Sequence, residues 1–241
     1  MKGAILAGGR GTRLHPYTIV IPKPLLPVGG VPVIEIIARQ FKYFGFDQVN
    51  VSLGYEGRQI EHLLEAHSSD SRLPKFHFFH EDEPLGTSGA IPALFGPYDS
   101  NLLVMNGDII TSLDLREMYK SHCESNAILT IAIRKTRHRL PVGSIEVDSE
   151  GDVIQFIEKP ELEFLDNVGI YVYSREVCNY IAPGEKVDVD ILVKRLLSEK
   201  KKVSTFLSEG PYYWIDIGTH ADYEKANTEI STLLNQIPFM K

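Results

Sequence analysis

A short apolar run, Lys2–Ala7, is followed at once by Gly8 and Gly9. An apolar run of this length that ends in glycines is typical of a buried strand followed by a tight turn. A glycine-rich turn after the first strand of an α/β protein commonly contacts phosphate, because bare backbone N–H groups can approach the anion. This feature therefore predicts an α/β fold with an anion site at the end of its first strand.

The rest of the first half alternates strand and helix patterns. Apolar residues follow helical spacing over 33–44 and 60–67, and Gly45 stands where a helix C-cap is expected. Strands are predicted at 48–53, 76–80 and 101–105. Strands that alternate with helices favour a mostly parallel sheet with helices on both of its faces.

The second half is richer in strand patterns. They cover 126–134, 142–147, 153–157 and 168–173. Ser149–Asp152 is typical of a hairpin turn, and helical patterns return at 189–197 and 221–234. We therefore expect an α/β fold in one domain over residues 1–241, with a single mixed, mostly parallel sheet.

The overall charge argues against several classes of partner. The 241 residues carry a formal net charge of −7, whereas nucleic-acid binding needs a broad basic face. Cys123 and Cys178 are far apart in sequence, which favours a reducing compartment over a disulfide framework. Glycines interrupt the first apolar run too early for a signal peptide or a membrane span. We expect a cytoplasmic protein without a nucleic-acid or membrane partner.

Cations gather near the start of this acidic chain. Arg10, Arg13 and Lys23 precede the first acidic residue, Glu35. The P-loop string is absent, and Leu14 stands where the dinucleotide motif GxGxxG needs its last glycine, which disfavours a nicotinamide-binding dehydrogenase. A tight loop with solvated cations is one interpretation. A triphosphate site is the other, because prolines stiffen the segment and can hold Lys23 over the loop.

Short strings over nearly the whole chain point to a family. They are LAGGRGTRL at 6–14, PKPLLPV at 22–28, EPLGTSG at 83–89, NGD at 106–108, FIEKP at 156–160, NVGIY at 167–171 and WIDIG at 214–218. Together they resemble the sugar-1-phosphate nucleotidyltransferases, also called nucleotide-sugar pyrophosphorylases. The resemblance implies a Rossmann-like nucleotidyltransferase fold and an Mg²⁺-dependent reaction. In that reaction a sugar-1-phosphate oxygen attacks the α-phosphorus of a nucleoside triphosphate and pyrophosphate leaves.

The resemblance also assigns roles to residues of the first half, 1–125, which is mainly the nucleotide-binding half. Arg13 would hold the departing pyrophosphate and Lys23 would contact the phosphates at the reacting centre. Asp108, together with Asp216 of the second half, would bind Mg²⁺, for which carboxylate oxygens are suitable ligands. The nucleotide-binding residues would be Leu6, Ala7, Gly8, Gly9, Gly11, Thr12, Glu81, Gly86 and Thr87.

The second half, 126–241, is implied to be mainly the sugar-phosphate-binding half. Lys159 would contact the sugar phosphate and Glu158 the sugar hydroxyls, with Asn167 and the backbone of Gly143 completing the pocket. Outside the resemblance, Glu158 and Lys159 read simply as a surface ion pair. Val142 stands where many relatives carry Tyr and Val168 where Ala is common, so the identity of the sugar stays open.

Glu81 bears on the choice of base. In the resembled family this position faces the base edge, and a carboxylate only accepts hydrogen bonds. Guanine offers two adjacent donors, N1–H and N2–H₂, so Glu81 favours GTP, although some uridylyl-transferring relatives also carry Glu there. We expect GTP and mannose-1-phosphate as substrates. Heptose-1-phosphate with GTP, and glucose-1-phosphate with dTTP or UTP, are the alternatives within this class.

Further alternatives concern the whole chain. A non-catalytic regulatory paralogue with the same fold is the rival from a different class, but Arg13, Lys23, Asp108 and Asp216 are all present. The cluster RKTRHR at 134–139 resembles an RNA-binding patch, and after a predicted strand we expect a solvated loop there. The chain ends at Lys241, so no second activity is expected, and a homo-oligomer is one of the open oligomeric states.

Overall fold

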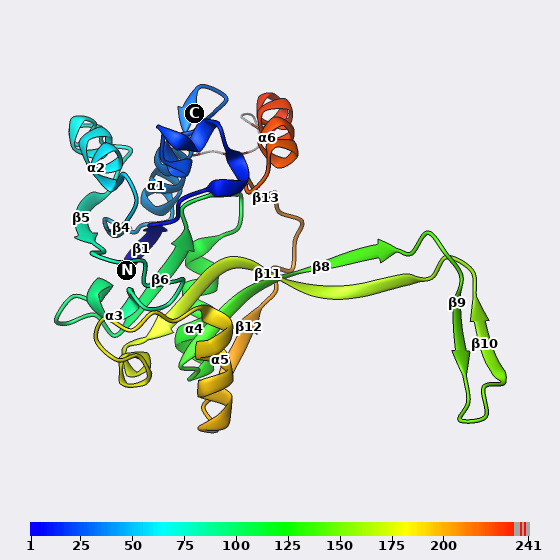
Figure 1. Cartoon of the computed structure of the whole chain (residues 1–241). Helices are drawn as coiled ribbons and strands as arrows, with labels where there is room; N and C mark the ends of the chain where they lie inside the picture. Colours follow the sequence, from blue (N-terminus) through cyan, green and yellow to red (C-terminus); the bar gives the residue numbers. More distant parts are fainter. Residues whose placement is uncertain (234–236, 238, 240–241) are drawn as a thin grey trace.

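The computed structural model describes residues 1–233, 237 and 239. Its central sheet has seven strands in the order β12-β8-β11-β6-β1-β4-β5 (Figure 1). Their bounds are β1 Lys2–Ala7, β4 Gln48–Leu53, β5 Lys75–His80, β6 Asn101–Asn106, β8 Leu129–Arg139, β11 Glu161–Ser174 and β12 Val203–Phe206. β11 runs antiparallel to β6 and β8, and the other neighbouring strands pair in parallel. The prediction of a mixed, mostly parallel sheet is confirmed.

Helices cover both faces of this sheet, as the alternating patterns predicted. Successive strand residues point to opposite faces, so Ile5 and Met105 enter one buried cluster while Ala4 and Val104 enter the other. The first cluster is completed by helices α1 Val33–Tyr43, α2 Gly57–Ala66, α4 Leu115–Ser125 and α6 His220–Leu233. The second is completed by α3 Ile91–Leu94 and α5 Val189–Ser198. Within the described part of the chain, no helix combines the length and apolar character needed to cross a bilayer.

Short elements bring distant segments to the sheet. β7 Ile109–Thr111 pairs antiparallel with β13 Trp214–Asp216, which places Asp216 opposite Ile109. The remaining short elements are β2 Pro27–Val28, β3 Val31–Pro32, and the 3₁₀ turns η1 Thr12–Leu14, η2 Tyr17–Ile19, η3 Lys23–Leu25 and η4 Arg175–Tyr180. The two halves of the chain meet in the central sheet, where β11 pairs with β6, and the β7–β13 pair adds a second contact beside the carboxyl end of β6.

The sequence did not predict α4 or β12, nor the short elements α3, β2, β3, β7 and β13. α4 has few buried positions, so its apolar spacing is weak, but the Asp114 side chain caps it by accepting hydrogen bonds from the backbone N–H groups of Arg116 and Glu117. β12 is a short edge strand. The predicted helix over 221–234 agrees with α6, except that Leu234 lies outside the described residues.

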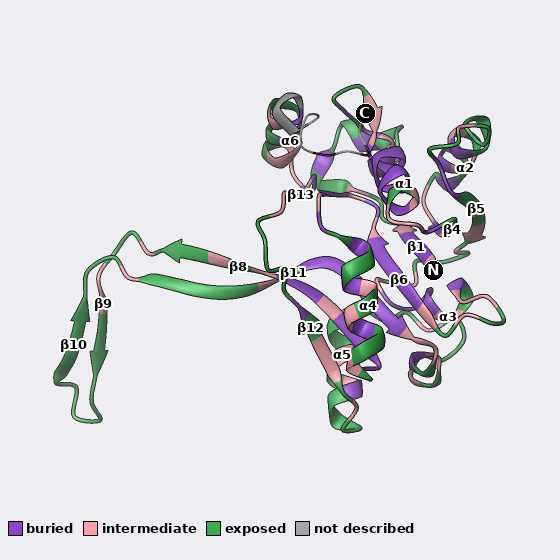
Figure 2. Cartoon of the chain, turned by 180° about the vertical axis from the view of Figure 1, so that it is seen from behind, coloured by how far each residue is buried: buried purple, intermediate pink, exposed green. Residues whose placement is uncertain are grey.

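β8 and β11 continue past the sheet as a two-stranded arm, which ends in a hairpin of β9 Ser144–Val147 and β10 Val153–Ile157 (Figure 1). The predicted turn at Ser149–Asp152 is confirmed, and Gly151 adopts a φ of 92° there. Most of the arm is exposed (Figure 2). The solvated loop expected at 134–139 is wrong, because these residues form the outer part of β8.

Acidic residues on β11 explain this extension of β8. Arg134 lies 3.5 Å from Asp166 and Arg137 lies 3.4 Å from Glu163 across the ladder. Opposite charges facing one another on paired strands stabilise the pairing. The basic cluster therefore belongs to a strand whose charges are matched by its neighbour.

Candidate active site

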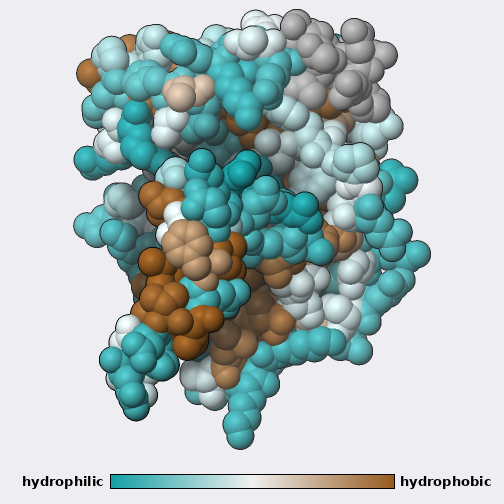
Figure 3. All heavy atoms as spheres, turned by 90° about the vertical axis from the view of Figure 1, so that its right-hand side faces the viewer, coloured by the Kyte–Doolittle hydropathy of each residue, from teal (hydrophilic) through white to brown (hydrophobic). Residues whose placement is uncertain are grey.

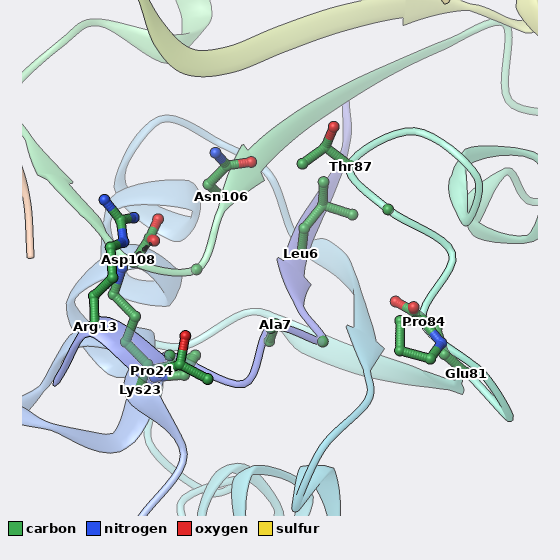
Figure 4. Close-up of a pocket in the computed structure, with 16 residues that line it drawn as sticks. Leu6, Ala7, Arg13, Lys23, Pro24, Glu81, Pro84, Thr87, Asn106 and Asp108 are labelled. Carbon is green, nitrogen blue, oxygen red and sulfur yellow. Dashed lines mark hydrogen bonds and ion pairs between the residues drawn. The ribbon is translucent and has the colours of Figure 1, made fainter. Parts of the chain in front are cut away.

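A cavity of about 350 Å³ lies at the carboxyl ends of β1 and β6, where open α/β sheets bind ligands. Figure 4 shows Glu81 at one end of this pocket and Arg13, Lys23 and Asp108 at the other. Its lining residues are Leu6, Ala7, Gly8, Gly9, Gly11, Thr12, Arg13, Lys23, Pro24, Glu81, Pro84, Gly86, Thr87, Asn106, Gly107 and Asp108. They include every residue that the family resemblance assigns to the nucleotide.

The loop after β1 depends on close backbone approaches. Gly11 directly precedes η1 with a φ of 61°, and its carbonyl accepts hydrogen bonds from Leu14 N at 2.9 Å and Thr18 Oγ1 at 2.7 Å. A Cβ at Gly54, just after β4, would lie 2.6 Å from the carbonyl oxygen of Gly8. Only glycine permits this approach, which keeps the loop low over the sheet and leaves the pocket open.

Lys23 joins two carboxylates from opposite halves of the chain. Its ammonium, which is buried, forms an ion pair with Asp108 Oδ2 and lies 3.4 Å from Asp216 Oδ1. Asp108 lies in the turn between β6 and β7, and the pairing of β13 with β7 brings Asp216 alongside. The residues that the resemblance assigns to the metal and the phosphates are therefore in contact.

The local electrostatics favour a further cation at these carboxylates. Burial and the charge of Asp108 raise the pKa of Asp216, against the opposing effects of Lys23 and Arg13. Asp108 Oδ1 is buried and has no hydrogen-bond partner among the described residues. An unpartnered carboxylate oxygen beside a second carboxylate fits Mg²⁺, which takes one or two protein carboxylates and otherwise binds waters and substrate phosphates. The described residues contain no cluster of three or more metal-ligating side chains, so any such ion would need those additional ligands.

Arg13 lies against the same acidic group. A Cβ at Gly218 would come 3.1 Å from the Arg13 guanidinium and 3.1 Å from the Asp216 carboxylate. Gly218 therefore makes room for both side chains. Its position in the WIDIG string was the only sequence signal for this role.

Glu81 is held firmly at the other end of the pocket. Ser52 Oγ donates to its Oε1 at 2.6 Å and Leu85 N donates to its Oε2 at 2.9 Å. Each carboxylate oxygen has a second lone pair, so the side chain is oriented without being saturated. Sequence reasoning missed Ser52, although a buried polar residue near the end of an apolar strand is a usable signal.

Gly86 and Thr87 rest on the start of α5. Thr87 N donates to Asp188 Oδ1 at 3.0 Å, and Thr87 Oγ1 accepts from Val189 N at 2.8 Å. Gly86 has a φ of 75°, and a Cβ there would lie 2.7 Å from Asp188 Oδ1. Asp188, which the sequence did not single out, thus positions this side of the pocket.

The residues assigned to the sugar phosphate lie elsewhere. Glu158 and Lys159 follow β10 at the outer end of the arm, with Lys159 in a left-handed backbone conformation at a φ of 47°. Gly143 is beside them, since a Cβ there would meet Glu158 Oε2 at 3.2 Å. Asn167 lies at the base of the arm and bonds to Tyr171 and to Gly169 N. In the described structure, none of the four lines the pocket.

The sequence of this chain matches a known protein family. The sequence profile of the nucleotidyl transferase family matches residues 2–232. This chain belongs to that family. The matched range includes both the β1 loop and the WIDIG string, so Lys23, Asp108 and Asp216 all lie within it.

Relatives of this family member differ in the base and sugar that their names specify. A D-glycero-alpha-D-manno-heptose 1-phosphate guanylyltransferase of Aneurinibacillus thermoaerophilus is 32% identical over 95% of this chain and 98% of its own length. A UTP–glucose-1-phosphate uridylyltransferase of Synechocystis sp. is 31% identical over 94% of this chain, which spans 62% of that relative. The crystal structure of HddC from Yersinia pseudotuberculosis complexed with GMP-PN has a TM-score of 0.70 and 28% identity, covering 95% of this chain and 99% of the other.

Proposed function

We propose that this chain transfers a nucleoside monophosphate from a nucleoside triphosphate to a sugar-1-phosphate and releases pyrophosphate. The observation that carries the proposal is the contact of Lys23 with Asp108 and Asp216 at the rim of a glycine-rich pocket. Reactions of this type need little covalent help from the protein, because alignment and charge neutralisation supply most of the rate. The pocket provides both cations and backbone N–H groups for that purpose.

For the residues of the pocket and for Asp216 beside it we propose the roles that the family resemblance implies. A sugar-1-phosphate oxygen forms a bond to the α-phosphorus while the bond from that phosphorus to the pyrophosphate oxygen breaks. Arg13 would neutralise the negative charge that develops on the leaving pyrophosphate. Lys23 would orient the reacting phosphates, and Asp108 and Asp216 would hold Mg²⁺, whose charge would further stabilise the phosphate oxygens.

We further propose GTP as the nucleotide. Glu81 stands opposite the phosphate end of the pocket, and each of its oxygens keeps a lone pair for the adjacent N1–H and N2–H₂ donors of guanine. The guanylyl relative and the GMP-PN complex support this choice, whereas the uridylyl relative at similar identity supports UTP. For the sugar we propose mannose-1-phosphate, with a manno-configured heptose-1-phosphate as the alternative.

A substrate matrix tests the function. Five nucleoside triphosphates would be combined with mannose-, heptose- and glucose-1-phosphate in the presence of Mg²⁺, and pyrophosphate release would be measured. We expect the highest kcat/KM for GTP with a manno-configured sugar. Release with UTP or dTTP and glucose-1-phosphate would overturn the substrate choice, and no release in any combination would favour the regulatory paralogue.

A further inference from the structure

The pocket has enough cationic side chains for one phosphate-rich substrate but not for two. Its lining cations in the described structure are Arg13 and Lys23, and Lys23 is already paired with two carboxylates. A sugar-1-phosphate brings another phosphate group and hydroxyls that need polar partners. Glu158 and Lys159 offer such groups, and both are exposed on the arm.

The arm is built to stay extended. Its strands pair residue by residue from Asn167 and Ile133 out to Glu161 and Arg139. At about 3.3 Å per residue, this ladder carries Lys159 on the order of 20 Å beyond the sheet. Glu163 is ion-paired with both Lys135 and Arg137 across the ladder. Folding back onto its own pocket would therefore require breaking this ladder.

The hairpin at the end of the arm has one apolar face. The register of β9 and β10 puts Ile145, Val147, Val153 and Phe156 on the same side, and they are 54%, 55%, 63% and 61% exposed. Figure 3, which faces the end of the arm, shows hydrophobic residues gathered among polar ones. An isolated two-stranded hairpin is marginally stable in water. An exposed apolar face on such a hairpin therefore indicates a surface that binds a partner.

The same chain carries a surface that matches this hairpin. Ile19, Val20 and Ile21 lie between Arg13 and Lys23 in sequence, and they are 54%, 68% and 40% exposed. Arg10 and Arg13 of this loop are exposed, and residues 8–22 contain no acidic residue. Residues 140–158, by contrast, contain five acidic residues and no Lys or Arg. Opposite charges would orient the hairpin on the loop, and apolar contact would stabilise it. The acidic hairpin would be repelled by an anionic membrane, which favours a protein partner.

We propose that two copies of this chain pair reciprocally, each placing its β9–β10 hairpin against the other's 8–21 loop, so that Glu158 and Lys159 of one copy complete the pocket of the other. The hairpin and the 8–21 loop belong to one chain. The arm leaves the sheet at the carboxyl end of β6, which is also where the pocket lies. A closed two-fold pair needs two complementary surfaces on each chain, and every contact then occurs twice. The catalytic part of this inference rests on the proposed function, whereas the pairing does not.

Complementation between two defective variants tests the shared site. Asp108→Asn damages the pocket and leaves the arm intact, while Lys159→Ala does the reverse. The two chains, carrying different tags, would be co-expressed and the mixed pair purified through both tags. One intact site per pair is expected, which gives about half of the wild-type turnover and at least a tenfold gain over either variant alone. A mixed pair as inactive as its parents would overturn the inference.

The reciprocal mixture is the matched control. A wild-type chain paired with an Asp108→Asn/Lys159→Ala chain has no intact site if the arm acts on the other copy. It keeps half of the activity if the arm serves its own pocket. An arm that acts on the other copy and an arm that serves its own pocket therefore give opposite results in the two mixtures. If wild type shows no transfer activity in the substrate matrix, the proposed function fails, and that failure is seen before either mixture is compared.

Sedimentation tests the pairing without any activity. Wild type should have twice the mass of the 27.1-kDa chain. Val147→Glu puts a charge on the apolar face and should give the single chain, whereas Gln155→Glu makes the same charge change on the opposite face and should leave the pair intact. A monomeric wild type, or pairing that survives Val147→Glu, would overturn the proposed interface.

Discussion

At the scale of single residues, Asp108 is the most exacting position. Its Oδ1 is buried without a partner and its Oδ2 is paired with Lys23. Asp108→Asn keeps the shape but removes the charge, so kcat should fall by about 10²–10³ while circular dichroism stays unchanged. The exposed Asp82→Asn is the control and should retain activity.

Chelation of Mg²⁺ should abolish wild-type pyrophosphate release, because Asp108 and Asp216 are proposed to hold this ion. Full activity in the presence of a metal chelator would show that the two carboxylates have no metal role.

Glu81 supports a second prediction at this scale. Glu81→Gln sets an amide donor against one of guanine's donors, and a mismatched buried polar group costs about 1–3 kcal/mol. The kcat/KM for GTP should fall about ten- to a hundredfold, while that for UTP holds or rises. Glu83→Gln, an exposed neighbour outside the pocket, is the charge-matched control. If the preference for GTP survives Glu81→Gln, the base is recognised by other groups.

At the scale of elements, His122 links α4 to the sheet. Its Nδ1 lies 2.8 Å from Thr130 Oγ1 and its Nε2 lies 3.0 Å from Ser174 Oγ. Burial lowers the pKa of His122 to about 4. The unfolded chain, with a His pKa of about 6.5, binds more protons between those values. The contribution of His122 to the free energy of unfolding is therefore complete above about pH 6.5. It falls, by up to about 3 kcal/mol, as the pH drops toward 4.

Urea unfolding at pH 7.5 and pH 5 checks this prediction. The midpoint of wild type should fall more between the two pH values than that of His122→Gln. His77→Gln, at an exposed position, should keep the wild-type slope. Equal slopes for wild type and His122→Gln would mean that α4 docking does not depend on a neutral imidazole.

At the scale of the whole molecule, the central sheet and its helices should fold without the β9–β10 hairpin. The apolar residues of β9 and β10 are exposed, whereas the buried clusters contain residues of the sheet and its helices. Replacing residues 144–157 with a short glycine-serine linker should therefore preserve folding and the rise in melting temperature with GTP. Sugar-1-phosphate transfer should fall at least a hundredfold. Transfer at the wild-type rate would show that the hairpin has no part in the reaction.

The sequence by itself determined the elements whose residues report their own environment. β1 and β4 were predicted with their observed bounds, because short apolar runs ended by polar or glycine residues record burial directly. The glycine strings marked the pocket for a similar reason, since close backbone approach excludes a Cβ. The outer part of β8 was missed because both of its faces are in water, so its charges resemble those of a loop until β11 is placed beside it.

Only the tertiary structure decided which distant residues meet. Lys23, Asp108 and Asp216 lie far apart along the chain and converge because β6 ends beside the β1 loop and β13 pairs with β7. Glu158 and Lys159, by contrast, stand away from that pocket although their string carries the same family resemblance. A string records which residues are present but not the distance between them. That distance depends on strand pairing and on the length and stiffness of the ladder that forms the arm.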